Sequence, residues 1–142
     1  LEFRRVLFRS MKAAASDAKL AIIDGSPGIG CPVIASLSGV DMVLIVAEPS
    51  ISGMSDLERI VQTAAKFGTK IAVCTNKYDT NIGHTKKIEE FSKERGLFFL
   101  GRIPFDSDAV RATNQGQSIV EIDCASGTAV RAVYEKAMEL LF

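Results

Sequence analysis

Residues 42–50 read MVLIVAEPS, and this stretch decides the fold class. Its first six residues are all apolar, which favours a strand buried on both faces, because a strand with one face in water alternates apolar and polar residues. Similar uninterrupted apolar runs recur at residues 20–23, 71–74 and 97–100. The sequence therefore predicts a mostly parallel sheet whose two faces are both covered by helices.

Helical patterns separate these apolar runs. In residues 55–67 the apolar positions recur three and four residues apart, and Gly68 follows as a stop signal. Similar patterns cover residues 81–95 and the segment from about Ser126 onward. Strands that alternate with helices predict an α/β fold, here a three-layer sandwich with the mostly parallel sheet between two layers of helices.

The composition excludes several classes of protein. The chain has 142 residues, 47% hydrophobic and 24% charged, with 17 basic and 17 acidic side chains. This balance is that of an average globular domain, and it gives no sign of a nucleic-acid partner, which would leave a basic excess. No apolar run reaches the roughly 20 residues that a transmembrane helix needs, so no membrane span is predicted.

The three cysteines point to a reducing compartment. Cys31, Cys74 and Cys124 are widely spaced, and the sequence has no CxxC pair. An odd, scattered set of cysteines is typical of free thiols, because disulfides and metal sites require paired or clustered cysteines. We therefore expect a cytoplasmic protein.

The first ten residues, LEFRRVLFRS, differ from the rest of the chain. They hold three arginines and one acid, and they have neither helical nor strand periodicity before Met11. The segment is too short and too basic to form the apolar core of a signal peptide. We expect residues 1–10 to be a non-native leader, after which 14 basic and 16 acidic side chains remain in residues 11–142.

Polar and glycine-rich segments follow the apolar runs. This placement matters because ligands of open parallel sheets bind at the carboxyl ends of the strands. The segments are Asp24-Gly25-Ser26-Pro27-Gly28, Glu48-Pro49-Ser50, Asn76-Lys77-Tyr78-Asp79 and Pro104-Phe105-Asp106. We expect them to form one ligand-binding edge.

Asp24 and the glycines after it suit a magnesium–phosphate site. A hard cation prefers oxygen ligands and keeps several waters, so one carboxylate at a strand end can hold Mg²⁺ through water. Glycines let the backbone approach a phosphate without a Cβ in the way. The alternative is a structural turn that ends the strand and caps the next helix.

The segment Asn76-Lys77-Tyr78-Asp79 suits a purine base. An amide both donates to and accepts from a base edge, and the methylenes of a lysine can cover the base face. The segment also fits the NKxD pattern of GTPases, in which the aspartate accepts hydrogen bonds from guanine. GTPases, however, place a glycine three residues after the first aspartate, whereas Gly28 lies four after Asp24. A further alternative is a turn and an N-cap for the following helix.

Four segments in this order resemble the MinD/ParA class of P-loop ATPases. They read IIDGSPGIGCPVIAS, DMVLIVAEPSISGMSDLERI, AVCTNKYD and LGRIPFD, and the resemblance covers residues 16–142. Within that class they are most similar to the MinD-superfamily branch that carries an inserted ferredoxin domain with two [4Fe–4S] clusters. The resemblance favours ATP over GTP, because that class pairs an NK dipeptide with adenine.

The resemblance also implies a role for each segment. Asp24 would be the Walker B-type aspartate that holds Mg²⁺, and Glu48 and Pro49 would end the strand opposite the phosphates. The switch loop that senses the γ-phosphate would comprise Gly25, Ser26, Pro27 and Gly28. Asn76 with Lys77 would read adenine, and a loop of Pro104, Phe105 and Asp106 would close over the base. The parent protein would bind ATP and Mg²⁺, dimerise with a second copy and work with a redox or iron–sulfur partner.

One departure from the class bears on activity. The chain contains no G-x-x-x-x-G-K-[ST] motif, so it has no loop to cradle the α- and β-phosphates. In the class this loop and the cluster-bearing insertion precede the segment that matches here. We therefore expect residues 11–142 to be the C-terminal half of a nucleotide-binding domain that alone neither binds ATP tightly nor hydrolyses it.

The missing loop also affects the sheet. In the class, the phosphate-loop strand lies between the strands that match residues 20–23 and 42–47, so its absence leaves either a gap or a direct pairing of those two. Two other functions stay open: half of a GTPase domain, and a non-catalytic α/β partner-binding domain that lost the loop by evolution. The last predicts an authentic start near Met11 and a stable monomer.

Overall fold

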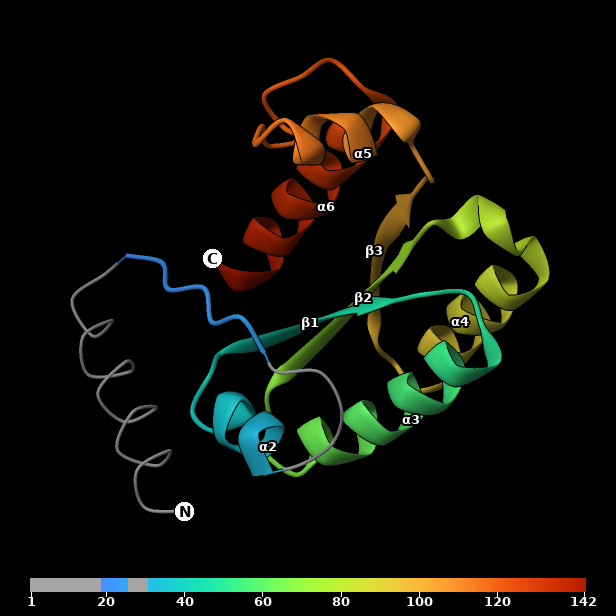
Figure 1. Ribbon diagram of the computed structural model, residues 1–142. Helices are drawn as coiled ribbons and strands as arrows, with labels where there is room; N and C mark the ends of the chain where they lie inside the picture. Colours follow the sequence, from blue (N-terminus) through green and yellow to red (C-terminus); the bar gives the residue numbers. More distant parts are fainter. Residues whose placement is uncertain (1–18, 26–30) are drawn as a thin grey trace.

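The computed structural model describes residues 19–25 and 31–142 and has a parallel sheet at its centre (Figure 1). Its strands are β1 (Met42–Ala47), β2 (Lys70–Asn76) and β3 (Phe98–Ile103), in the order β1-β2-β3. Both strand pairs are parallel, with a register shift in the β2–β3 pair between Val73 and Cys74. The expected leader, residues 1–10, lies outside the described residues, as do Ser26, Pro27 and Gly28.

Helices cover both faces of this sheet. They are α2 (Cys31–Leu37), α3 (Ile51–Ala65), α4 (Ile82–Glu94), α5 (Ser107–Asn114) and α6 (Ala125–Leu141), with a short 3-10 helix η1 (Tyr78–Thr80) before α4. Alternate residues of β2 face opposite sides: Val73 belongs to a core cluster with α3 and α4, whereas Cys74 belongs to a second cluster with α6. The predicted three-layer α/β fold is therefore confirmed (Figure 1).

The helix boundaries follow from capping side chains. Asn81 accepts a hydrogen bond from His84 N at 3.0 Å and starts α4 where the sequence predicts it. α3 begins at Ile51, earlier than predicted, because the Ser50 hydroxyl accepts from Gly53 N at 2.9 Å. A Cβ at Gly53 would lie 2.2 Å from the carbonyl oxygen of Glu48, so this close turn after β1 requires glycine.

The strand predicted at residues 20–23 is wrong, because residues 20–25 form no strand and the Ile22 side chain is 81% exposed. A strand needs a neighbour to take its backbone hydrogen bonds, and the pairing described for β1 is with β2 alone. Of the two outcomes that the sequence left open, the direct pairing of the run 20–23 with β1 is therefore not observed.

The prediction that β1 is buried on both faces is also wrong. Ile45 and Ala47 are buried against the α3 side, but Leu44 and Val46 are 40% and 56% exposed. By strand alternation these two residues share the face on which α6 packs, and α6 packs over β3. An unbroken apolar run thus becomes a half-covered edge strand.

Candidate functional site at the carboxyl edge of the sheet

The ends of the three strands lie side by side. In the parallel register Ala47 pairs with Thr75 and Asn76 pairs with Ile103, so the segments that follow β1, β2 and β3 leave the sheet at the same edge (Figure 1). These are three of the four segments that the sequence assigned to a ligand-binding edge.

The end of β2 presents an amide with free hydrogen-bonding capacity. Asn76 Oδ1 accepts from the backbone N–H of Lys77 at 3.0 Å, and Lys77 has a left-handed conformation with φ 52°. This bond uses one lone pair of the amide oxygen. Within residues 19–25 and 31–142, a second lone pair and the two N–H donors of the amide have no hydrogen-bond partner, which is the combination that pairs with a purine edge.

An ion pair joins the ends of β1 and β2. Lys77 Nζ lies 2.9 Å from Glu48 Oε1, and both side chains are about half exposed. Exposed pairs of this kind contribute about 0.5 kcal/mol, so the contact orients the two side chains more than it stabilises the fold. Pro49, next to Glu48, is buried and holds the chain as it turns toward α3.

A second contact joins the end of β2 to the segment after β3. Asp79 Oδ1 accepts from the backbone N–H of Phe105 at 2.8 Å. The Phe105 ring itself is half exposed, on the segment that starts at Pro104. An exposed aromatic side chain beside an amide offers a stacking surface for a planar base.

Asp106 is the most heavily used carboxylate at this edge. One oxygen accepts from Asp108 N at 2.9 Å and caps α5, and the other accepts from Ser126 N at 3.0 Å in the first turn of α6. These backbone hydrogen bonds lower the pKa of the Asp106 carboxyl, because they favour its charged form. Asp106 therefore anchors the segment after β3 to two helices.

Asp24 and Gly25 lie elsewhere among the described residues. They precede α2, and a Cβ at Gly25 would lie 3.8 Å from Ser36 Oγ in that helix. Asp24 is exposed, and no hydrogen bond or ion pair within residues 19–25 and 31–142 joins it to Glu48, Asn76 or Asp106. The structure thus brings Glu48, Pro49, Asn76, Lys77, Pro104, Phe105 and Asp106 to one edge, but not Asp24 or Gly25.

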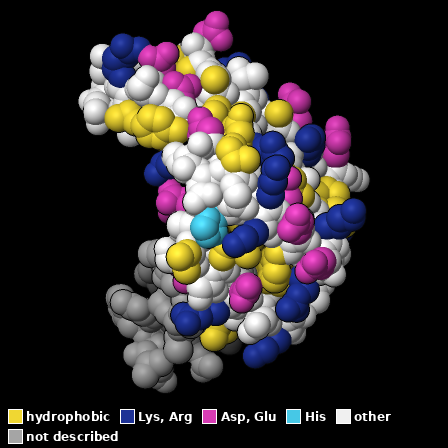
Figure 2. Space-filling view, turned by 90° about the vertical axis from the view of Figure 1, so that its right-hand side faces the viewer, with side chains coloured by type: hydrophobic (Ala, Val, Ile, Leu, Met, Phe, Trp, Pro, Cys, Tyr) yellow, Lys and Arg dark blue, Asp and Glu magenta, His cyan; other side chains and the backbone are white. Residues whose placement is uncertain are grey.

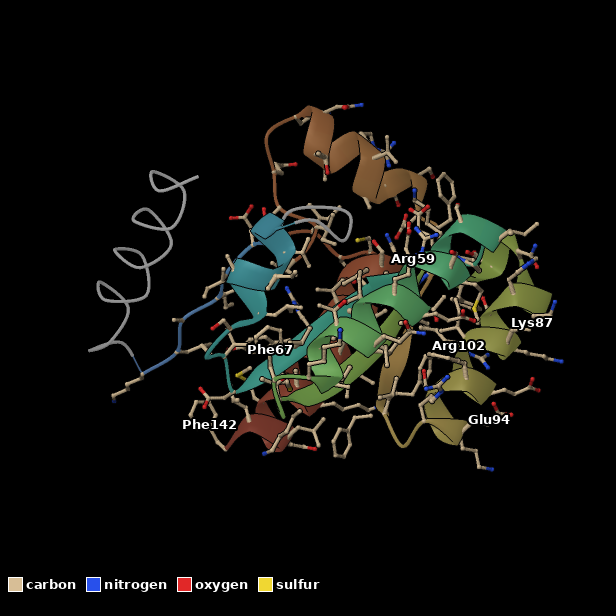
Figure 3. The ribbon with its side chains drawn as sticks, turned by 90° about the horizontal axis from the view of Figure 1, so that it is seen from below. Arg59, Phe67, Lys87, Glu94, Arg102 and Phe142 are labelled. Atoms are coloured by element: carbon tan, nitrogen blue, oxygen red, sulfur yellow. The ribbon has the colours of Figure 1, made fainter. Side chains whose placement is uncertain are left out.

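The sequence did not point to the residues that support Tyr78. The Arg102 guanidinium lies 5.7 Å from the centre of the Tyr78 ring and forms two hydrogen bonds, of 2.5 and 2.9 Å, with Glu89 of α4. Figure 3 shows Arg102 beside α4, from which Lys87 and Glu94 project away. The carboxylate of Glu89 raises the pKa of Arg102 further above its ordinary value. The one sequence feature that pointed to Arg102 was its charge, since the other residues of the run FFLGRI are uncharged.

The described residues offer no metal site of protein ligands. Within residues 19–25 and 31–142 no group of three or more His, Cys, Asp or Glu side chains gathers around a common point. Burial raises the pKa of the Cys74 thiol to about 11, which keeps it protonated and unfit as a ligand at neutral pH. No helix in the described part of the chain is long and apolar enough to cross a bilayer.

The face that carries α4 is mixed in charge. Figure 2 shows basic and acidic side chains interspersed there, with small apolar areas between them. Neither sign dominates this view, so it shows no continuous basic stripe of the kind that follows a nucleic-acid backbone.

Fold and edge together define an α/β protein of the open parallel-sheet type, whose ligands bind where the strands end. Comparison with known proteins narrows this class. The chain is 27% identical over 139 residues to the septum site-determining protein MinD of Helicobacter pylori, covering 90% of this chain and 52% of that protein. Its fold matches the MinD cell division protein of Aquifex aeolicus with a TM-score of 0.76 at 20% identity, over 97% of this chain and 60% of that one.

Other relatives come from the archaeon Methanocaldococcus jannaschii. An uncharacterised protein is 30% identical over 87% of this chain and 41% of its own length. An iron–sulfur cluster carrier protein is 25% identical over 83% and 45%, and an uncharacterised ATP-binding protein is 26% identical over 99% and 54%. No protein-family model matches the sequence.

These matches confirm the resemblance read from the sequence: the chain is a relative of MinD/ParA-type proteins and has a MinD-like fold. It spans about half the length of these curated relatives.

Proposed function

We propose that this chain is the C-terminal portion of an ATP-binding P-loop ATPase of the MinD/ParA class, and that the carboxyl edge of its sheet is the base-binding side of the nucleotide site. The main support for the proposal is that the carboxyl ends of β1, β2 and β3 lie at one edge of the sheet. The Lys77–Glu48 ion pair joins the ends of β1 and β2, and the Asp79–Phe105 hydrogen bond joins the end of β2 to the segment after β3. They place the Asn76 amide and the exposed Phe105 ring on one edge.

The chemistry of the edge fits a neutral planar base better than a phosphate. The positive charge of Lys77 is paired with Glu48, and the Asp106 carboxylate adds negative charge, so the tied part of the edge has no excess of cations. Phosphates require several N–H donors or cations. The phosphates of ATP would therefore be bound by residues other than these.

In residues 19–25 and 31–142, no group of three or more His, Cys, Asp or Glu side chains gathers to hold a metal ion or an iron–sulfur cluster. Asp24 is a single exposed carboxylate, and the buried thiols Cys74 and Cys124 do not gather with other ligands in the described residues. We propose that Asp24 contributes to a magnesium site completed by the phosphate loop of the full protein, where Mg²⁺ would offset phosphate charge. The [4Fe–4S] clusters would belong to a segment outside the present sequence, and dimerisation and a redox partner would likewise be properties of the full protein.

The lack of a phosphate loop has a direct consequence for activity. Phosphoryl transfer depends on positioning and on stabilising charge at the phosphates, and the G-x-x-x-x-G-K-[ST] loop supplies both. Since this chain lacks the motif, we expect it alone to show neither tight ATP binding nor turnover. The scattered cysteines favour a cytoplasmic location for the protein.

The test compares two proteins. Isothermal titration calorimetry and a phosphate-release assay would be applied to the 142-residue chain and to the full-length protein that carries it. The proposal expects ATP binding and turnover in the longer protein only, and weaker ATP binding there after Asn76→Ala. Turnover by the 142-residue chain, or full-length binding that ignores Asn76→Ala, would contradict it.

A further inference from the structure

We infer that Asp79 is a positioning residue: its carboxylate holds the segment after β3, residues 104–106, against the end of β2, and the NKYD segment consequently does not read guanine. The first half of this inference concerns the fold alone. The second half rests on the proposed nucleotide site.

Asp79 makes a specific long-range contact. Its Oδ1 accepts from Phe105 N at 2.8 Å, across 26 positions of sequence. The next residue, Asp106, is bound to the first turns of α5 and α6 through Asp108 N and Ser126 N. Residues 104–106 are therefore held from two sides, by Asp79 on the β2 side and by two helices on the other.

Asp79 itself sits on a fixed support. It lies in η1, where Thr80 N donates to Lys77 O at 3.0 Å and the Thr80 hydroxyl donates to the same oxygen at 2.8 Å. The Thr85 hydroxyl of α4 donates to Tyr78 O at 2.8 Å. The guanidinium of Arg102 in β3 covers the Tyr78 ring. Because its neighbours are held on both sides, Asp79 can set the position of Phe105 rather than follow it.

These contacts compete with guanine recognition. The Watson–Crick edge of guanine offers two adjacent N–H donors, and a carboxylate that reads it needs both oxygens directed at the base. Here one oxygen of Asp79 is used by Phe105 N. The lysine that would cover the base is likewise held at its end by Glu48. Asn76 is the one amide side chain of the segment, and an amide offers both acceptor and donor groups to a base edge. Base selection therefore falls to Asn76 and to the backbone of residues 104–106.

Amide hydrogen exchange measured by NMR on the 142-residue chain tests the positioning role. Asp79→Ala removes the acceptor and should speed exchange at Phe105 roughly tenfold, the factor that corresponds to about 1.4 kcal/mol. Asp79→Asn keeps a carbonyl oxygen and should restore the rate to within about threefold of the wild type. Asp56→Ala removes an exposed carboxylate from α3 and serves as the matched control, with no change expected at Phe105.

Two outcomes would overturn the positioning role. One is an unchanged Phe105 rate in Asp79→Ala. The other is an Asp79→Asn rate as fast as that of Asp79→Ala, because an oxygen acceptor at this position would then not suffice to hold the segment. The Asn variant stays informative even if the Ala variant fails to fold.

Competition between ATP and GTP tests whether the NKYD segment reads guanine. The binding of both nucleotides is compared between the full-length protein and its Asp79→Asn variant. The inference expects the ratio of the two dissociation constants to change by less than about threefold. A guanine reader would lose at least roughly tenfold in GTP affinity while ATP affinity stayed constant, since an amide places a donor opposite a guanine donor. If the wild type binds neither nucleotide, the proposed function fails, but the exchange result still decides the role of Asp79.

Discussion

The two edges of the sheet carry similar residues and have different surroundings. On the β3 edge, Leu100 is 3% exposed and packs with Val133 and Ala137 of α6. On the β1 edge, Leu44 occupies the same face of the sheet but is 40% exposed, because α6 packs over β3.

The difference shows that an apolar run does not fix its own burial. β1 is the more uniformly apolar strand, MVLIVA against FFLGRI in β3, yet two of its apolar side chains, Leu44 and Val46, are 40% and 56% exposed. Burial depends on which helices and strands lie alongside. An exposed, uncharged edge strand is also a place where another chain can pair.

The largest expected difference is between the same substitution at the two edges. Leu100→Ala leaves a cavity beside α6 and should lower the free energy of unfolding by about 3 kcal/mol. Leu44→Ala removes a side chain that is already partly in water, so it should cost less than about 1 kcal/mol. Urea unfolding followed by circular dichroism measures both. Equal losses would mean that the β1 face is covered in solution, for example by a second molecule, and dilution would then lower the stability of the wild type.

Substitutions at the carboxyl ends of β1 and β3 should also differ in their effect on stability. Asp106 binds two helix N-termini, whereas Glu48 forms one exposed ion pair. Asp106→Ala should therefore lower the urea midpoint roughly twice as much as Glu48→Ala. A larger effect at Glu48 would contradict the assignment of Asp106 as the anchor of the β3 end.

The pH dependence gives the sign of the Asp106 contribution. Its pKa is lowered in the folded protein, so the contribution is present above the ordinary aspartate pKa of about 4 and is lost as the pH falls through the folded value. The stability difference between wild type and Asp106→Asn should accordingly be constant from pH 7 to pH 5 and shrink below about pH 4. A difference that grows in acid would show that the carboxylate is not the stabilising form.

The sequence predicted the fold best where local signals and tertiary contacts agree. Met42–Ala47 forms a strand with the predicted bounds, and α4 begins within one residue of the predicted start at residue 81, because the apolar pattern marks both elements locally. The three strand-end segments of the site were also found, since their position depends only on strand order and parallel direction. Whether Asn76 and its neighbours bind a nucleotide stays a prediction.

What the sequence could not give depends on distant partners. The tie between Asp79 and Phe105 joins positions 26 residues apart, and the support of Tyr78 by Arg102 requires knowing that β3 lies beside β2. The run 20–23 has the apolar residues of a strand, but no strand in the described part of the chain pairs with it. Local pattern fixes which backbone conformation is accessible, and the neighbour decides whether it forms.

The smallest effect is therefore expected at residues 20–23. Ile22→Ala should change the free energy of unfolding by less than about 0.5 kcal/mol, because the side chain is 81% exposed, whereas Ile45→Ala in β1 should cost about 3 kcal/mol. Amide exchange gives a second measure: amides 20–23 should exchange almost as fast as in an unstructured peptide, and the β1 amides bonded to β2 much more slowly. Protection of residues 20–23 together with a large loss in Ile22→Ala would mean that this run pairs directly with β1. Such pairing would exclude a gap between these two strands, the other outcome that the sequence left open. The different exposure of Leu44 and Leu100 would then have to be explained by the position of α6 alone.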